Sequence, residues 1–230
     1  MLFDPMYFLF LLPALVLSLF FSARVKSTFA KYSKVRAASG YTGAQAALKM
    51  LERSGVTNVS VRMIDGMLTD NYNPMTRVLS LSSEVYNGTS LAALGVACHE
   101  AGHALQHAEG YRWLGLRTIL VPVVSFGSQL PVYIILLGAL FNSMNLIWIG
   151  IILFSAVVLF SLVTLPVEWD ASARAKKRLV ACGLLAPSEV QGAGKVLNAA
   201  FGTYVAAAIS ALMTLLYYLV RFAGVGSRRD

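Results

Sequence analysis

The stretch LIWIGIILFSAVVLFSLVTL, residues 146–165, decides the class of fold that this chain adopts. It contains no charged side chain, and its length matches the roughly 20 residues that an α-helix needs to cross the apolar core of a bilayer. Similar apolar runs cover residues 2–22, 116–141 and 199–222. The sequence therefore predicts a mainly α membrane protein with about four transmembrane helices.

The overall composition also favours a membrane protein. Hydrophobic residues make up 57% of the chain and charged residues only 13%, which is about half of the charged fraction of a typical soluble domain. A secretory signal peptide is the alternative interpretation of residues 2–22. The N-terminal end of that run carries Asp4 and no basic residue, and Ser22-Ala23-Arg24 is a poor cleavage site. We therefore expect an uncleaved anchor.

The distribution of the net charge of +8 predicts an orientation in the membrane rather than binding to nucleic acid. Of the 19 Lys and Arg residues, 11 lie within residues 24–117 and five within residues 174–195, beside the apolar runs. Basic residues gather on the cytoplasmic side of membrane proteins. We therefore expect these two segments in the cytoplasm and both termini outside, although Arg221, Arg228 and Arg229 oppose this orientation.

The segment between the first two apolar runs predicts a small α+β domain. Thr42-Gly-Ala-Gln45 has the pattern of a capping box that begins a helix, and Gly55 is placed to end that helix. Alternating apolar and polar residues at 56–63 and 77–82 predict two strands. The turn-rich stretch 70–74 lies between them and predicts a loop.

A further helix is predicted from Ser90, as its cap, to about Glu109, and it carries the motif with the clearest chemistry. Its sequence includes HEAGH, in which His99 and His103 are four residues apart and share one face of the helix. This spacing suits two ligands of one Zn²⁺ ion. Glu100 projects beside the metal, where it can accept a proton from a water activated by zinc. The motif predicts a zinc site that hydrolyses peptide bonds; a buried pair of hydrogen-bonded histidines is the alternative.

A catalytic zinc site needs a third protein ligand, and we expect Glu168 to provide it. Two apolar runs separate Glu168 from the motif, so both should emerge on the same face of the membrane. Asp170 is the local competitor, but on a helix it points away from Glu168. His107 repeats the spacing of four, yet it lies too far along the helix from the first histidine to share one ion. The alternative role of Glu168 is that of a solvated acid paired with Arg174 or Lys176.

These residues resemble the YugP-type neutral zinc metallopeptidases of bacterial membranes, over most of the chain. The stretches that carry the resemblance are HEAGHALQ (99–106), SLAALGVA (90–97), LSSEVY (81–86), TGA (42–44), DNYNP (70–74) and TYVAAA (203–208). The family is similar in outline to the HtpX and CAAX-prenyl-type membrane gluzincins, whose third ligand is the Glu of a Glu-x-x-Ala-Asp pattern after a transmembrane hairpin. Here the pattern reads Glu168-Trp-Asp-Ala-Ser172. The resemblance implies Glu168 as a zinc ligand, and it places Ser172 where an Asp would steady a ligand histidine.

The resemblance also implies how a substrate is held. In gluzincins an edge strand beside the active-site helix pairs with an extended peptide, and by position residues 77–82 would be that strand. A donor that stabilises the oxyanion is required as well. Tyr204, at the start of the last apolar run, is a hypothesis for this donor, and an interfacial aromatic without a catalytic role is the alternative.

The predicted chain has five segments. They are a transmembrane anchor (1–23), a cytoplasmic zincin-like domain with a short sheet and the HExxH helix (24–115), a transmembrane hairpin (116–165), a cytoplasmic segment with the third zinc ligand (166–198), and a last transmembrane helix with a short tail (199–230). The loop 142–145 joins the two helices of the hairpin, and Pro166 is expected to end the second of them.

Taken together, the residues and the resemblance predict a membrane-integrated zinc endopeptidase of the gluzincin type in the bacterial cell membrane. One Zn²⁺ is bound by His99, His103 and Glu168, and Glu100 is the catalytic base, on the cytoplasmic side. Its expected partners are the lipid bilayer and a protein or peptide substrate, without nucleic acid, while a membrane-protein partner or a homo-oligomer is left open. The alternative function is a non-catalytic, zinc-stabilised membrane scaffold or adaptor.

Overall fold

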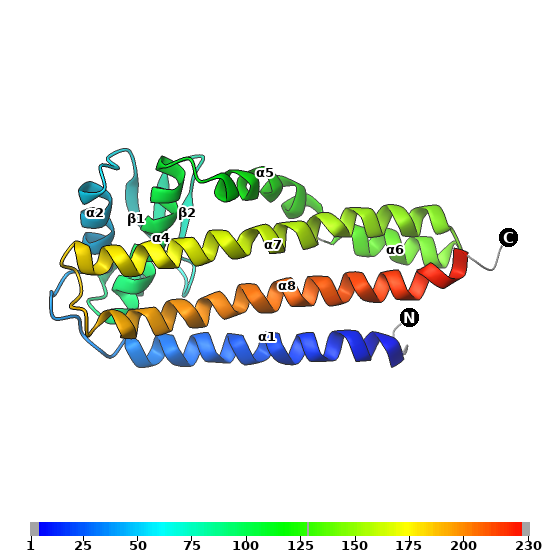
Figure 1. The fold of residues 1–230 in the computed structure, drawn as a ribbon, viewed down its shortest axis with the longest axis horizontal. Coiled ribbons are helices and arrows are strands. Elements are labelled where there is room, and N and C mark those ends of the chain that lie inside the picture. The colour runs from blue at the N-terminus through cyan, green and yellow to red at the C-terminus, as the bar shows by residue number, and fades with distance from the viewer. Residues whose placement is uncertain (1–4, 128, 227–230) are drawn as a thin grey trace. The chain divides into compact units, whose positions relative to one another are not determined.

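The computed structural model describes residues 5–127 and 129–226, which form helices and three short strands (Figure 1). The elements in chain order are α1 (Pro5–Tyr32), α2 (Gly43–Arg53), β1 (Ser60–Ile64), β2 (Asn71–Asn73), β3 (Val78–Ser82), α3 (Ser83–Asn87), α4 (Leu91–Ala108), α5 (Arg112–Gly127), α6 (Leu130–Leu140), α7 (Met144–Ala181) and α8 (Val190–Gly226). They divide into two compact units, and α1, α5, α7 and α8 each contribute to both. The first unit comprises Met1–Phe20, Leu116–Leu165 and Thr203–Asp230, and the second comprises Phe21–Gly115 and Pro166–Gly202.

Three of the described helices are long and apolar enough to cross a membrane: α1, α7, and α8 as far as Phe222. The run at 116–141, which was expected to form one spanning helix, is divided between α5 and α6, with Pro131 in the first turn of α6. α6 has 11 residues, and at 1.5 Å per residue its length is about 16 Å, roughly half of the apolar core of a bilayer. A fourth spanning helix is therefore not confirmed. The tail residues Arg228 and Arg229 lie outside the described residues.

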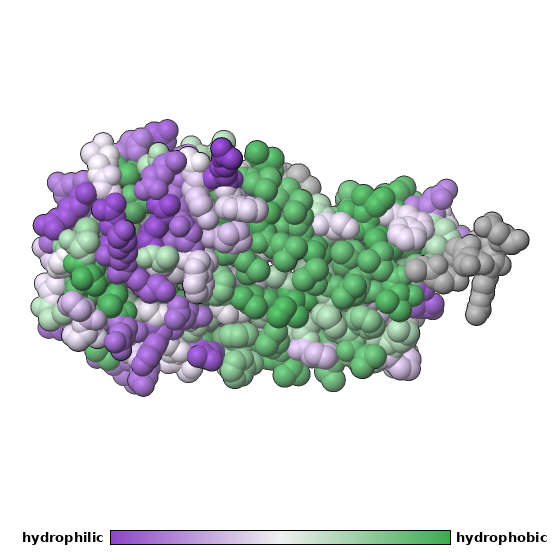
Figure 2. Space-filling model, in the orientation of Figure 1, coloured by the Kyte–Doolittle hydropathy of each residue, from purple (hydrophilic) through white to green (hydrophobic). Residues whose placement is uncertain are grey.

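The first unit consists of apolar helices that pack through small residues and aromatic rings. α6 turns back along α7, and a Cβ on Gly150 would lie 2.9 Å from the carbonyl oxygen of Pro131, so a larger side chain would separate the two helices. Tyr217 of α8 is buried beside Tyr7 of α1, with ring centroids 5.3 Å apart. Figure 2 shows that the visible surface of this unit is mostly hydrophobic. An apolar surface of this extent fits contact with lipid.

Helix α7 continues through Pro166 to Ala181, so the prediction that Pro166 ends a helix is wrong. A proline inside a helix removes one backbone hydrogen bond and costs about 3 kcal/mol. The residues that follow, Val167 and Ala171, are fully buried, and their packing in the second unit offsets that cost. One uninterrupted helix therefore carries both an apolar segment and Glu168.

The second unit contains a three-stranded sheet in the order β1-β3-β2. β1 runs parallel to β3, and β2 runs antiparallel to it, with Tyr72 opposite Leu79. The strands expected at 56–63 and 77–82 correspond to β1, which begins only at Ser60, and to β3. β2 lies in the stretch 70–74 that was predicted to be a loop. Because β2 covers one side of β3, the prediction that residues 77–82 form an edge strand is wrong; the edges are β1 and β2.

Helix α2 packs on α4 and begins and ends where its sequence indicates. The Thr42 hydroxyl accepts a hydrogen bond from the backbone N–H of Gln45, and the Gln45 side chain accepts one from the backbone N–H of Thr42. Gly55 follows the helix with a φ of 74°, a left-handed conformation that glycine adopts without strain. The capping box and the glycine stop were therefore both predicted correctly.

Candidate metal centre

Helix α4 is the central helix of the second unit and carries both histidines of the motif. It begins at Ser90, whose hydroxyl accepts a hydrogen bond from the backbone N–H of Ala93 at 3.1 Å, as the sequence predicted. Most of its residues are buried. His99 and His103 lie one turn apart on the same face, with ring centroids 4.8 Å apart. The helix thus presents two imidazoles in one direction.

A glycine brings α7 against this part of α4. A Cβ on Gly102 would lie 2.7 Å from the carbonyl oxygen of Ala171, closer than side-chain carbons approach backbone oxygen atoms. The absence of a side chain at Gly102 thus leaves room for the backbone of α7. Glu168, one turn before Ala171 on α7, is consequently 1% exposed and faces the histidines.

Three potential ligand atoms converge at this point. Glu168 Oε2 lies 3.1 Å from His99 Nε2 and 3.6 Å from His103 Nε2. One ligand atom from each of the three residues lies within 4.8 Å of the other two. The structure therefore brings together the two histidines and the glutamate that the sequence proposed as a set, although 69 residues separate His99 from Glu168.

The second nitrogen of each imidazole also has a defined partner. His99 Nδ1 lies 3.1 Å from the hydroxyl oxygen of Ser172, so the serine is the outer partner of this imidazole. His103 Nδ1 lies 3.0 Å from Gln106 Oε1. Gln106 was not singled out from the sequence. The available signal was its position three residues after His103, on the same face of the helix.

The donor set fits a zinc ion. Two neutral imidazoles and a carboxylate are ligands that zinc takes in catalytic sites, at bond lengths of about 2.0–2.2 Å. Ligand atoms at tetrahedral angles on such bonds are about 3.3–3.6 Å apart, close to the observed 3.1 and 3.6 Å. In both imidazoles Nε2 faces the carboxylate while Nδ1 is held by an outer partner, which is the usual arrangement of a metal-binding histidine.

Glu100 lies on α4 directly after the first histidine and is also buried. On an α-helix it points about 100° away from His99 and about 60° away from His103. Its carboxylate therefore lies beside the ligand face rather than on it, where it can act on a molecule bound next to the metal ligands. A carboxylate in this position can accept and return a proton.

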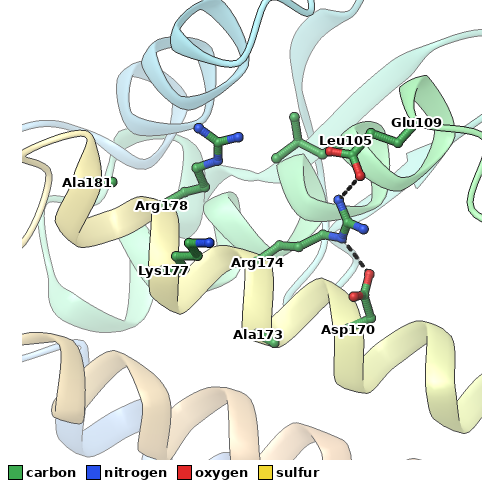
Figure 3. Close-up of a pocket in the computed structure, with 8 residues that line it drawn as sticks. All are labelled: Leu105, Glu109, Asp170, Ala173, Arg174, Lys177, Arg178 and Ala181. Carbon is green, nitrogen blue, oxygen red and sulfur yellow. Dashed lines mark hydrogen bonds and ion pairs between the residues drawn. The ribbon is translucent and has the colours of Figure 1, made fainter.

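The acidic residue that competed with Glu168 has a different environment. Asp170 Oδ2 accepts hydrogen bonds from the Arg174 guanidinium and from the Gln106 side chain. Arg174 also pairs with Glu109, at the end of α4. Figure 3 shows Arg174 extended between these two acids, in a pocket of about 510 Å³. The interpretation of Glu168 as a solvated partner of Arg174 is therefore wrong: Glu168 is buried, and Asp170 takes the arginine.

His107 is not part of the group of three and contacts the sheet instead. Its Nδ1 lies 2.9 Å from the hydroxyl of Tyr72 on β2. The two side chains line a cavity of about 290 Å³ together with Ala104 and Arg77. Burial raises the pKa of the Tyr72 hydroxyl, so this group keeps its proton at neutral pH. His107 thus connects the helix of the candidate metal centre to an edge strand.

Cys98, next to His99 on α4, is not a member of the cluster of His99, His103 and Glu168. Cys98 is fully buried on α4, and burial raises the pKa of its thiol well above the usual value, which disfavours the thiolate that binds metals. Tyr204 lies half-buried on α8, in the first unit. Its suggested contribution to oxyanion stabilisation stays a prediction.

Comparisons with known proteins agree with the chemistry of this centre. Residues 7–223 match the model of a family described as "Putative neutral zinc metallopeptidase". The chain is 50% identical over 218 residues to a protein of Bacillus subtilis (strain 168) described as "Putative membrane protease YugP", covering 94% of this chain and 97% of that protein. No solved structure matches the chain. This chain belongs to the neutral zinc metallopeptidase family that the matching model describes.

Proposed function

We propose that this protein is a membrane-integrated zinc endopeptidase in which His99, His103 and Glu168 hold one zinc ion and Glu100 is the general base. The observation that carries the proposal is the convergence of two imidazole nitrogens on a buried carboxylate, at 3.1 and 3.6 Å. The family and the name of the bacterial relative support the same class of enzyme.

The chemistry requires a proton to move from water to the leaving amine. Zinc in this centre would polarise the peptide carbonyl and lower the pKa of water towards about 7. The Glu100 carboxylate accepts the proton of the attacking water as the new C–O bond forms. It then donates that proton to the amide nitrogen as the C–N bond breaks, which returns Glu100 to its starting state. Because Glu100 is buried, the proton is not readily lost to bulk water.

Three protein ligands favour a catalytic centre over a structural one. Structural zinc sites are usually closed by four protein ligands, whereas catalytic sites keep one position open for water or substrate. The group found in the described part of the chain has three members, His99, His103 and Glu168. Both cysteines, which would be typical ligands of a structural site, are buried with free thiols. These features favour a peptidase over a zinc-stabilised scaffold.

The substrate would add as a further strand to β2, not to β3 as the sequence suggested. Within the described residues β2 pairs with another strand on one side only. The hydrogen bond between Tyr72 and His107 places β2 beside the helix of the metal centre. An extended peptide on this edge would pair through its backbone, so the proposed substrate is an unfolded or extended segment of a membrane or membrane-adjacent protein.

We place the enzyme in the bacterial cell membrane with the metal centre on the cytoplasmic side. The three apolar helices support insertion in a membrane. The cytoplasmic placement of the metal centre is inferred from the basic residues. The second unit contains most of them, and basic segments of membrane proteins are retained in the cytoplasm.

The test compares wild type with Glu100→Gln in detergent, after zinc content has been measured and matched. The substrates are casein, as an unfolded polypeptide, and an unfolded membrane protein. We expect hydrolysis to fall by at least about 100-fold, as is typical for loss of a general base, with zinc retained. The control is Glu84→Gln, which changes an exposed glutamate on α3. Equal cleavage by wild type and Glu100→Gln, or no cleavage by either with zinc bound, would favour the scaffold.

A further inference from the structure

Gln106 makes a complete set of hydrogen bonds although it is fully buried, with 0% of its surface exposed. Its Nε2 lies 2.8 Å from the carbonyl oxygen of Val167 and 2.8 Å from Asp170 Oδ2. Its Oε1 lies 3.0 Å from His103 Nδ1. A buried amide with every partner in place has one orientation, because the flipped amide would place its oxygen against two other acceptors.

The partners of Gln106 decide which way its amide group faces. The Val167 carbonyl can only accept, so the NH₂ group of Gln106 must face it. Asp170 Oδ2 also receives the Arg174 guanidinium, which can only donate, and so acts as an acceptor towards both neighbours. The amide oxygen is left to face His103, and His103 Nδ1 must then carry the proton. The lone pair is therefore on Nε2, the nitrogen that faces Glu168.

We propose that Gln106 is a positioning residue of the zinc centre: it fixes the His103 tautomer that can bind metal, and Asp170, held by Arg174, fixes Gln106. This inference rests on the zinc site proposed above and adds three residues that lie outside the ligand set. The contacts also join the two helices that supply the ligands, because Gln106 is on α4 and both of its NH₂ acceptors are on α7. Figure 3 shows the outer end of this series of hydrogen bonds, where Arg174 bridges Asp170 and Glu109.

A carboxylate is a common hydrogen-bond partner of a metal-binding imidazole. At position 106, however, the neighbouring acceptors exclude a carboxylate. A glutamate at position 106 would still accept from His103. Its second oxygen, however, would face the Val167 carbonyl and the Asp170 carboxylate without a proton to share. Two acceptors in contact in a buried site repel each other. Gln106→Glu is thus expected to weaken the centre. An additional Asp170→Asn change, which supplies an amide donor in place of one of the two acceptors, is expected to restore it in part.

The experiment measures zinc affinity by chelator competition for detergent-purified wild type, Gln106→Met, Gln106→Glu and the double variant Gln106→Glu/Asp170→Asn. Loss of an outer partner typically weakens metal binding by about 10- to 100-fold, and we expect that loss for both single variants. The double variant should regain part of the affinity, because Asp170→Asn removes the contact with the carboxylate but not the contact with the Val167 carbonyl. Gln191→Met, at an exposed glutamine of α8, is the control.

Two further readouts separate positioning from general stability. The absorption spectrum of the cobalt-substituted protein reports the geometry at the ligands, and thermal unfolding of the metal-free protein reports folding. We expect an altered cobalt spectrum in the single variants and recovery in the double variant. Wild-type affinity in both single variants, or no recovery in the double variant, would overturn the proposal. If the wild type itself binds no zinc, the result contradicts the proposed zinc site and not the role of Gln106 within it.

Discussion

Glu168 and Asp170 are two residues apart on α7 but have different partners. Glu168 faces two imidazoles, whereas Asp170 faces an arginine and an amide. Glu168→Gln replaces a charged ligand by a weakly coordinating amide. Loss of a side chain that only holds a metal ligand in place typically weakens metal binding by about 10- to 100-fold. We expect a larger fall in zinc affinity for Glu168→Gln, because the ligand itself is changed.

Chelator competition in detergent measures this change, with Glu84→Gln as the exposed control. A Glu168→Gln variant that keeps the affinity of the wild type would exclude Glu168 as a ligand.

Asp70 is a residue whose charge should lower stability. Its carboxylate accepts hydrogen bonds from the backbone N–H and the hydroxyl of Ser82, but burial outweighs them and raises its pKa. A carboxyl group with a raised folded-state pKa favours folding below its ordinary pKa, and this contribution is lost as pH rises through the folded-state value. Asp70→Asn keeps an acceptor for Ser82 without the charge, so we expect a small rise in melting temperature at pH 7.

The gain should shrink as the pH is lowered to about 4, near the ordinary pKa of Asp. Thermal unfolding of the metal-free protein in detergent at both pH values tests this. Asp65→Asn, at an exposed site, is the control. A melting temperature that falls at pH 7 in Asp70→Asn would show that the hydrogen bonds of the charged form outweigh its burial.

At the scale of single residues, helix periodicity made part of the site predictable. A spacing of four residues places His99 and His103 on one face whatever surrounds the helix. Glu168 was inferred from its position after two apolar runs. The partner Gln106 could not be recognised in this way, because its role depends on the Val167 carbonyl and Asp170 of another helix. Periodicity describes one helix and carries no information on its neighbour.

At the scale of elements, the contact between α4 and α7 depends on one glycine. Gly102→Ala adds a methyl group 2.7 Å from the Ala171 carbonyl oxygen, so the two helices must separate. Overpacking of this kind typically costs about 1–3 kcal/mol. Because Glu168 is on one helix and the histidines on the other, we expect zinc affinity to fall by at least about 10-fold.

The matched control for this variant is Gly115→Ala, a helical glycine with open space around the added Cβ. Chelator competition and thermal unfolding are measured for both. Equal zinc affinity in Gly102→Ala and wild type would show that the helix spacing does not determine the geometry of the metal centre.

The order of the strands could not be predicted from the sequence. β3 was recognised because Leu79 and Leu81 alternate with Ser80 and Ser82 and give it an apolar side. β2 has three residues, two of them asparagines, and such a segment is too short and too polar to show an alternating pattern. Without β2, β3 was taken for an edge strand. The error therefore came from the prediction of a loop at 70–74, where the structure has β2.

At the scale of the whole molecule, the proposed orientation can be tested by labelling. Cys98 and Cys182 are buried, so an introduced exposed cysteine reacts against a low background. Asn145→Cys lies in the first turn of α7, and Ser188→Cys lies in the loop before α8; both sites are exposed. We expect an impermeant maleimide to label Asn145→Cys in intact cells and Ser188→Cys only after the membrane is opened. The reverse pattern would place the metal centre outside the cytoplasm.

The membrane class of the protein was predictable from composition, but the number of spanning helices was not. Apolar runs of about 20 residues show that a segment avoids water. They do not show whether the segment remains one helix. The run at 116–141 contains Pro122 and Pro131 and is divided into α5 and α6, whereas α7 continues through Pro166. A proline is tolerated where packing compensates for it, and packing is decided by the rest of the fold.

Because α7 is one continuous helix, it fixes the distance along its axis between its apolar stretch and Glu168. Glu168 follows the apolar stretch that ends at Leu165 by three residues, which along an α-helix is about 4.5 Å. If that apolar stretch lies in the bilayer, as proposed above, Glu168 lies within about one helical turn of it along α7. A substrate anchored in the same bilayer could present only the peptide bonds within a few residues of its own anchor. The cut would then be selected by distance from the membrane more than by the side chains at the cleaved bond.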